Sequence, residues 1–174
     1  TAIADYSTSL TAFLDETGSV TITPADIDIG SYDNCSVELS VAPDTFTCDD
    51  VGNFIVVTLT ATDPGGNTDT DTAILMILDS IYPTAITKDI TVELDENGEA
   101  YIDASHVDNG SYDNCGVELN VEPNVFTCSD LDLPTKAPVT ALLTATDPSR
   151  LSDSATANVT VLDLLPPVIT LTGD

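Results

Sequence analysis

The chain has 174 residues, 42% of them hydrophobic, and its 30 acidic residues face only three lysines and arginines. The net charge of −27 excludes nucleic acid as a partner and argues against direct membrane insertion, because both surfaces are anionic. Disorder is the first alternative for such a charge, but dense β-branched runs and a positive mean hydropathy favour a folded chain. We therefore expect an acidic folded protein that depends on bound cations to lower its self-repulsion.

An internal duplication organises the whole chain. Three motifs occur twice in the same order: GSYDNC at 30 and 110, FTC at 46 and 126, and TATDP at 60 and 144. The offset is 80 residues for the first two motifs and 84 for the third, so the second copy contains four extra residues. A repeat of this length is a small domain rather than a solenoid unit. We expect domains at 1–80 and 81–165, with 166–174 beginning a following module.

The apolar segments are short, β-branched and bounded by Gly, Pro, Asn or Asp, which is typical of an all-β sandwich. In the first copy we predict strands at 8–14, 19–23, 36–42, 45–48, 54–62 and 70–78. In the second copy the corresponding strands are 88–94, 99–103, 116–122, 125–128, 138–146 and 154–162. The segments 14–18 and 94–98 predict hairpin turns in which glycine supplies a positive φ, and 63–67 predicts a further turn.

The four cysteines divide into two pairs of equal spacing, Cys35 with Cys48 and Cys115 with Cys128. No Cys-x-x-Cys motif is present and His106 is the one histidine, which argues against a zinc site. We expect one disulfide within each copy, which stabilises by about 3 kcal/mol through loop closure. Disulfides imply an oxidising compartment, which is outside the cell, at its surface or in the periplasm.

The ordered motifs carry a family resemblance over about residues 1–165. Leu-Asp-Glu-x-Gly, Gly-Ser-x-Asp-Asn-Cys, Phe-Thr-Cys, Thr-Ala-Thr-Asp-Pro-Gly-Gly-Asn and Val-Leu-Asp before a proline resemble the HYR-type immunoglobulin-like repeats. These occur in very long surface adhesins of gliding and marine bacteria. The resemblance implies two tandem immunoglobulin-like β-sandwich domains in an extracellular stalk, with neighbouring repeats of the same polypeptide as partners and no oligomer. The second copy departs from the pattern at 149–151, where Ser-Arg-Leu replaces Gly-Gly-Asn.

Immunoglobulin-like topology brings several acidic loops to each end of a domain. The junction between the domains is expected to receive Asp79, Asp108, Asp113, Asn114 and Asp147, together with Asp15, Glu16 and Asp50. Equivalent residues at the free end of the first copy are Asp28, Asp33, Asn34 and Asp63. Carboxylates without basic partners need a cation, and Ca²⁺ accepts six to eight oxygens with loose geometry. The alternative is ordinary turn chemistry, in which each aspartate accepts backbone N–H bonds.

The favoured hypothesis is a structural stalk or spacer, stiffened by Ca²⁺ and disulfides, and not an enzyme. His106 has Asp26 in its place in the first copy, and no Gly-x-Ser-x-Gly elbow is present, so catalysis has no candidate. One alternative is a module that binds a surface glycan or protein, for which an exposed apolar cluster in one copy only is the signal, with 131–136 the first place to look. Another alternative is an accessory domain of a secreted enzyme.

Overall fold

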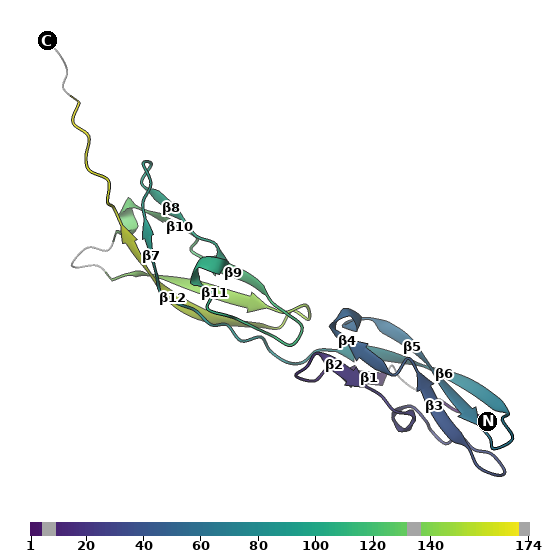
Figure 1. The fold of residues 1–174 in the computed structure, drawn as a ribbon. Helices are drawn as coiled ribbons and strands as arrows, with labels where there is room; N and C mark the ends of the chain where they lie inside the picture. Colours follow the sequence, from purple (N-terminus) through teal and green to yellow (C-terminus); the bar gives the residue numbers. More distant parts are fainter. Residues whose placement is uncertain (5–9, 132–136, 171–174) are drawn as a thin grey trace. The chain divides into compact units, whose positions relative to one another are not determined.

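The computed structural model describes residues 1–4, 10–131 and 137–170. The chain divides into two compact units, Thr1–Ile81 and Tyr82–Asp174 (Figure 1). Each unit is an immunoglobulin-like β-sandwich made of one four-stranded and one two-stranded sheet, which confirms the predicted fold class.

The described residues of the first unit form six strands. They are β1 (Leu10–Phe13), β2 (Ser19–Thr21), β3 (Glu38–Ala42), β4 (Thr45–Thr47), β5 (Phe54–Thr62) and β6 (Thr68–Leu78). The larger sheet has the order β1-β6-β5-β3 and the smaller sheet pairs β2 with β4. The β1 strand runs parallel to β6, and the other pairs are antiparallel.

The second unit repeats this topology. Its strands are β7 (Ile90–Glu93), β8 (Glu99–Tyr101), β9 (Glu118–Glu122), β10 (Val125–Thr127), β11 (Val139–Thr146) and β12 (Ser152–Leu162). The sheets have the orders β7-β12-β11-β9 and β10-β8. The strand bounds of both units lie close to the predicted ones. Residues 8 and 9 of the first predicted strand, and residues 132–136 between two predicted strands, fall outside the described part of the chain.

Alternation along the long strands explains the sandwich. In β11 the inward residues Ala141, Leu143 and Ala145 are fully buried, while the residues between them face outward. Such a period of two buries one face of each sheet. The short sheet closes the core with Phe126, which is fully buried among residues of both sheets. Phe46 takes the corresponding place in the first unit and is 2% exposed.

In the part of the chain that the structure describes, four single helical turns interrupt the strands. They are η1 (Pro24–Asp26), η2 (Cys48–Asp50), α1 (Ala104–Val107) and η3 (Cys128–Asp130). The α1 turn begins at Asp103, whose side chain accepts a hydrogen bond from the N–H of Ser105. Helical periodicity is absent from the sequence because each of these helices is one turn long and is stabilised by its cap rather than by an apolar stripe.

Each unit has two distinct ends, which we name from the path of the chain. The entry end holds the loop before β3 or β9 and the turn between the last two long strands. The exit end holds the first hairpin turn, the η2 or η3 turn and the close of β6 or β12. In the first unit Leu14 donates to the carbonyl of Leu78 and Gly52 donates to the carbonyl of Ile77, which places these segments together at the exit end.

The predicted disulfides within each copy are wrong for this structure. Cys35 and Cys128 are free and exposed, whereas Cys48 and Cys115 are disulfide-bonded. The strand register gives the reason. Ala42, the last residue of β3, lies opposite Thr58 of β5, and Thr47, the last residue of β4, lies opposite Ser19 of β2.

That register makes β3 and β4 run in the same direction, from the entry end to the exit end. The two strands are therefore successive parts of one path that changes sheets, not a hairpin. At about 3.3 Å per residue this path covers about 25 Å, and disulfide geometry requires Cα atoms within about 7 Å. The same register in β9 and β10 separates Cys115 from Cys128.

Replacing Gly98 by alanine tests the packing of the exit end of the second unit. Gly98 has a φ of 77°, and an added Cβ lies 2.7 Å from the Sγ of Cys128. We expect Gly98→Ala to lower the free energy of unfolding by about 2 kcal/mol, because left-handed strain and overpacking add. Chemical denaturation measures this loss.

Gly52→Ala is the matched control, since its φ is also 77° but its Cβ meets nothing within 4 Å. It should cost only about 1 kcal/mol from strain. The double variant Gly98→Ala/Cys128→Ala should return to that smaller cost. Equal losses in Gly98→Ala and in the double variant would show that the sulfur contact is unimportant.

Candidate functional site

The entry end of the first unit is built from three aspartates that organise their own loops. Asp28 accepts from the N–H and hydroxyl of Ser31 at 2.9 and 2.5 Å. Asp33 accepts from the N–H of Cys35 at 3.0 Å. Asp63 accepts from the backbone and side-chain N–H groups of Asn67 at 2.9 and 2.8 Å. Asp33 and Asp63 line one shallow hollow, so the structure brings these two predicted residues together.

The entry end of the second unit uses equivalent residues with one important difference. Asp108 accepts from the N–H of Ser111 at 2.9 Å, and Asp147, which is buried, accepts from the N–H of Leu151 at 2.8 Å. The Ser-Arg-Leu segment supplies no side-chain amide like that of Asn67. Leu151 stands at the position of Asn67, so the side-chain bond from Asn67 to Asp63 belongs to the first copy.

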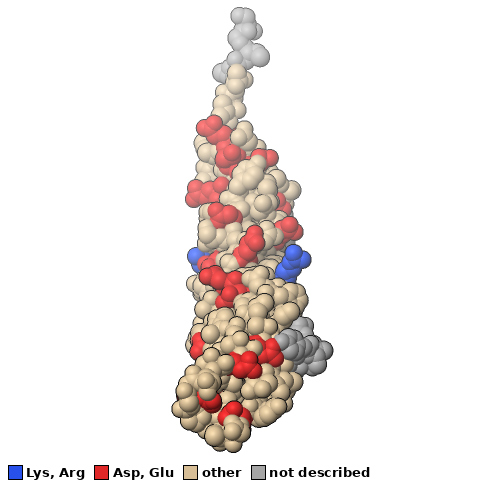
Figure 2. All heavy atoms as spheres, turned by 90° about the vertical axis from the view of Figure 1, so that its right-hand side faces the viewer, with Lys and Arg blue, Asp and Glu red and all other residues tan. Residues whose placement is uncertain are grey.

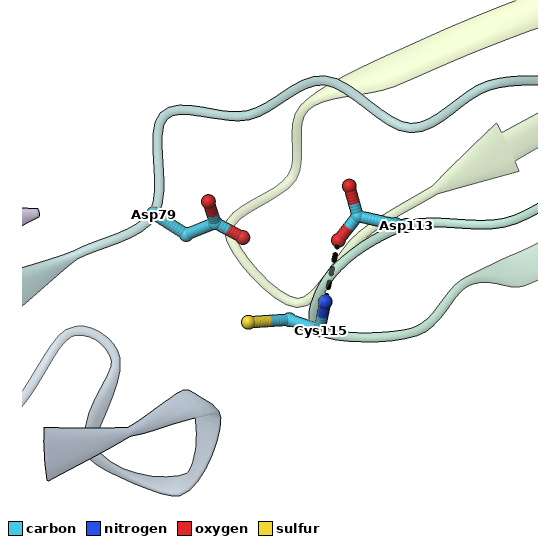
Figure 3. Close-up of side chains that lie close together, drawn as sticks. All are labelled: Asp79, Asp113 and Cys115. Atoms are coloured by element: carbon cyan, nitrogen blue, oxygen red, sulfur yellow. Dashed lines mark hydrogen bonds between the residues drawn. The ribbon is translucent and has the colours of Figure 1, made fainter. Parts of the chain in front are cut away.

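Asp113 is half-buried at this end of the second unit. Its Oδ2 accepts from the N–H of Cys115 at 2.8 Å, the bond drawn in Figure 3. Its Oδ1 is buried and has no hydrogen-bond partner among the residues the structure describes. A buried anionic oxygen without a donor is costly, and a bound cation removes that cost.

Asp79 directly follows β6, in the segment that leads to the second unit. It is 8% exposed, and its Oδ1 accepts from the N–H of Ile81 at 3.0 Å. Asp79, Asp113 and Cys115 each offer one potential ligand atom within 4.8 Å of the others (Figure 3). Because Cys115 is disulfide-bonded, its sulfur is not a thiolate, and the two carboxylates are the chemically useful part of this group.

The exit end of the first unit also uses its acids as caps. Asp15 accepts from the N–H and hydroxyl of Thr17 at 2.8 and 2.6 Å, and it fixes the first hairpin turn. Asp50 accepts from the N–H of Thr47 at 2.9 Å and caps the η2 turn. Glu16 and Asn34 are exposed, and Asn114 is half-buried. Metal ligation by these residues stays a prediction.

Local donors lower the pKa of several of these aspartates. The Thr17 hydroxyl is the main cause at Asp15, the Ser31 hydroxyl at Asp28, and the Asn67 amide at Asp63. The Ser111 hydroxyl lowers the pKa of Asp108 in the same way. Hydrogen bonds to the ionised form favour it. These carboxylates are therefore charged at neutral pH, when a cation can bind.

The lowered pKa values predict acid destabilisation with a definite sign. A folded pKa below the unfolded value of about 4 means that the native state binds fewer protons, so stability is present above pH 4 and is lost as pH falls further. We expect the urea concentration at the unfolding midpoint to stay constant between pH 7 and 5, because the decrease in charge repulsion offsets any loss of stability there. Below about pH 4 this midpoint should decrease. Asp15→Asn should flatten that fall. A stability that keeps rising to pH 3 would contradict this account.

Three further aspartates have a role that the sequence did not reveal. Asp69 accepts from the N–H of Ala2 at 3.0 Å, and Asp71 accepts from the N–H of Ala4 at 2.9 Å. In the second unit Asp153 accepts from the N–H of Ala85 at 2.9 Å. These side chains attach the first segment of each unit to its last long strand.

The remaining surface is acidic and offers few cations of its own. Figure 2 shows carboxylates spread over one face with basic side chains sparse on it. His106 is exposed, and its Nδ1 lies 2.9 Å from the Oδ1 of Asp103 in the cap of α1. Within the described ranges, no helix combines the length and apolar character needed to cross a bilayer.

Comparisons with known proteins give only distant similarities. No protein-family model matches the sequence, and no curated protein matches it. Among solved structures, human mucin-like protocadherin EC1-2 has 15% identity and a TM-score of 0.47, with 94% of this chain and 100% of that chain covered. Drosophila N-cadherin EC1-4 has 16% identity and a TM-score of 0.39, with coverages of 88% and 48%.

A three-immunoglobulin segment of titin is also similar, at 14% identity and a TM-score of 0.34, with 94% of this chain and 67% of that chain covered. Similarities at this level carry no functional argument. The fold assignment rests on the strand order of each unit, and the chemistry of the site rests on its carboxylates.

Proposed function

We propose that this chain is a pair of spacer repeats from the extracellular stalk of a bacterial surface adhesin of the HYR type. In this proposal Ca²⁺ binds the acidic ends of the repeats and stiffens the stalk, and no catalytic group is needed. The protein is secreted or held at the cell surface, and its direct neighbours are further repeats of the same polypeptide. The disulfide-bonded cysteines support the oxidising compartment that this location requires.

The observation that carries the proposal is the buried Oδ1 of Asp113, which has no hydrogen-bond partner in the described chain. Asp79 supplies a second carboxylate nearby, and the chain has only three basic residues against 30 acidic ones. Zn²⁺ prefers nitrogen and sulfur ligands, whereas these oxygen ligands suit Ca²⁺. Extracellular modules bind Ca²⁺ with dissociation constants of about 10⁻⁴ to 10⁻³ M.

Solution scattering tests the mechanical part of this proposal. With Ca²⁺ the maximum dimension of the two-repeat chain should increase and its distance distribution should narrow, because the bound cation restricts bending. Excess chelator should reverse both changes. Distributions that superimpose in Ca²⁺ and in chelator would remove the stiffening role.

A second candidate function, binding of a glycan or protein, is favoured by one surface. Phe13, Phe54, Val56 and Ile74 lie on the outer face of the large sheet of the first unit and are 52–65% exposed. Val56 is directly opposite Ile74 in the register of β5 and β6. The corresponding residues of the second copy are Glu93, Pro138, Thr140 and Asn158. At these positions the apolar side chains belong to the first copy, and they lie on a sheet. Residues 132–136 of the predicted 131–136 segment lie outside the described part of the chain.

The duplication supplies the variant that tests this second candidate. Val56→Thr/Ile74→Asn places the residues of the second copy on the first. Binding of the wild type and of the variant should be measured on a glycan array and on another molecule of this chain that is immobilised. Binding that the double variant loses supports a docking role, and binding that both proteins share contradicts it.

A further inference from the structure

The outer face of the large sheet of the first unit is almost uncharged. Among the described strand residues that the registers place on this face, Glu38 alone carries a charge, and it lies at the entry end of β3. Near the exit end the face carries apolar side chains that are 52–65% exposed, namely Phe13, Phe54, Val56 and Ile74. The chain as a whole has a net charge of −27. This face is therefore a place where a second acidic molecule can approach the first unit without meeting opposed carboxylates.

The second unit has carboxylates at the edges of the equivalent face. Phe13 of β1 corresponds to Glu93 of β7, and Ala42 of β3 corresponds to Glu122 of β9. These residues lie on the edge strands of the two large sheets. Charged side chains on edge strands oppose the association of sheets. The second unit has this protection at both edges of its sheet, whereas the first unit has apolar residues at the same two positions.

Hydroxyl groups cover the part of this face that lies nearer the entry end. In the register of β5 and β6, Thr58 lies opposite Thr72 and Thr60 lies opposite Thr70. A threonine hydroxyl both donates and accepts hydrogen bonds, so two such surfaces can pair with each other. A basic partner is not favoured, because Glu38 is the one carboxylate that the described strands offer it on this face. The face is thus complementary to a copy of itself.

The size of the face is sufficient for a weak interface. The β5 strand is paired with β6 along all of its nine residues, and β1 and β3 add shorter strands at the two edges. At about 3.4 Å per residue and about 4.8 Å between strands, the four strands cover about 450 Å² of flat area. The relief of the side chains increases the accessible area, so two such faces bury about 1,000 Å² or more when they meet, which is the range of specific but transient complexes.

We propose that two copies of this chain pair through the outer faces of the large sheets of their first units. The proposal rests on the second candidate function above and names a second copy of the chain as the partner, in place of the expected monomer. A two-fold axis through the apolar part brings this part of one chain against the same part of the other, which is how identical subunits share one surface. The second unit takes no part in this contact, because Glu93 and Glu122 flank its equivalent face.

Sedimentation velocity of the whole chain over a wide range of protein concentrations tests the proposal. We expect a monomer that converts to a dimer as the concentration rises. Added NaCl should strengthen the dimer, because it screens the repulsion between two chains of charge −27, whereas an interface made of ion pairs would weaken. A denaturing gel of the same sample without reductant should show monomer only. A chain that stays monomeric at every concentration, or a dimer that is covalent, would overturn the proposal.

Charge variants identify the face. Phe13→Glu/Ala42→Glu places the edge carboxylates of the second copy on the first, and it should raise the dissociation constant of the dimer about a hundredfold or more, because like charges would meet in the interface. Thr91→Glu/Asn120→Glu is the matched control, since it adds the same charge to the edge strands of the second unit, and it should dimerise like wild type. Equal losses in the two variants would assign the effect to net charge. An unchanged dimer in the first variant would exclude this face.

The variant Val56→Thr/Ile74→Asn adds no charge and guards against a folding defect in the charged variant. It should raise the dissociation constant about tenfold or more through lost apolar contact, and an unchanged dimer would again exclude the face. The dimer should form in chelator as well as in Ca²⁺, which separates this pairing from the calcium-stiffened stalk. Loss of the dimer in chelator would overturn the direct contact. Glycan binding by a chain that stays monomeric would overturn the choice of partner and leave the second candidate function in place.

Discussion

Replacing Phe126 by alanine is expected to lower the free energy of unfolding of the second unit by about 3–5 kcal/mol. Phe126 is fully buried and joins the two sheets of this unit through a core that includes Leu143 and Val159. Removing the ring loses its transfer free energy and leaves a cavity. For a domain whose net stability is about 5–15 kcal/mol, this is a large fraction.

Phe54→Ala is the matched control for this loss. It makes the same chemical change at a ring that is 65% exposed. Its cost should stay below about 1 kcal/mol, as for other exposed substitutions. Denaturant titration with a probe for each unit separates the two transitions. A Phe126→Ala protein within 1 kcal/mol of wild type would show that the core does not hold the sheets together.

Calcium is expected to produce the second largest effect. At a hundred-fold excess over its dissociation constant, each bound ion raises the free energy of unfolding by about 2.7 kcal/mol. With a dissociation constant of about 10⁻⁴ M this requires about 10 mM Ca²⁺. A thermal melt in Ca²⁺ and then in excess chelator measures the shift.

Screening of the net charge of −27 also stabilises the chain, so the control is NaCl at the same ionic strength. We expect Ca²⁺ to raise the melting temperature clearly beyond NaCl. Equal shifts in the two salts would assign the whole effect to screening and would leave no specific ion.

The strands could be predicted because their signals are local. In β5 the alternation of Val57, Leu59 and Ala61 with outward residues marks both the strand and its buried face. Gly18 and Gly98 mark the hairpin turns, and both have positive φ as expected. The turn residues and the two-residue period of the apolar pattern are therefore sufficient to predict a β-sandwich.

The disulfides could not be predicted from spacing because they depend on strand direction. The short interval between β3 and β4 in the sequence is compatible with a hairpin or with a path that changes sheets. Only the long-range partners decide, since β4 pairs with β2 and β3 pairs with β5. Cys35 and Cys48 thus lie far apart despite their closeness in sequence.

The acidic ends were predicted as groups but not in their details. Most of the candidate aspartates accept backbone N–H bonds from their own loops, as Asp28 and Asp63 do. The sequence does not reveal which carboxylate oxygen has no hydrogen-bond donor, because this depends on the orientation of each loop amide. The burial of the Asp113 Oδ1 without a donor is a property of the folded loop that the sequence does not reveal.

A calorimetric titration of the chain with Ca²⁺ tests the central claim most directly. The account predicts saturable binding at dissociation constants of about 10⁻⁴ to 10⁻³ M, weakened about tenfold or more at one site by Asp113→Asn. Asp103→Asn, which changes an exposed cap, should titrate like wild type. Absence of saturable heat, or an Asp113→Asn protein that binds like wild type, would contradict the claim.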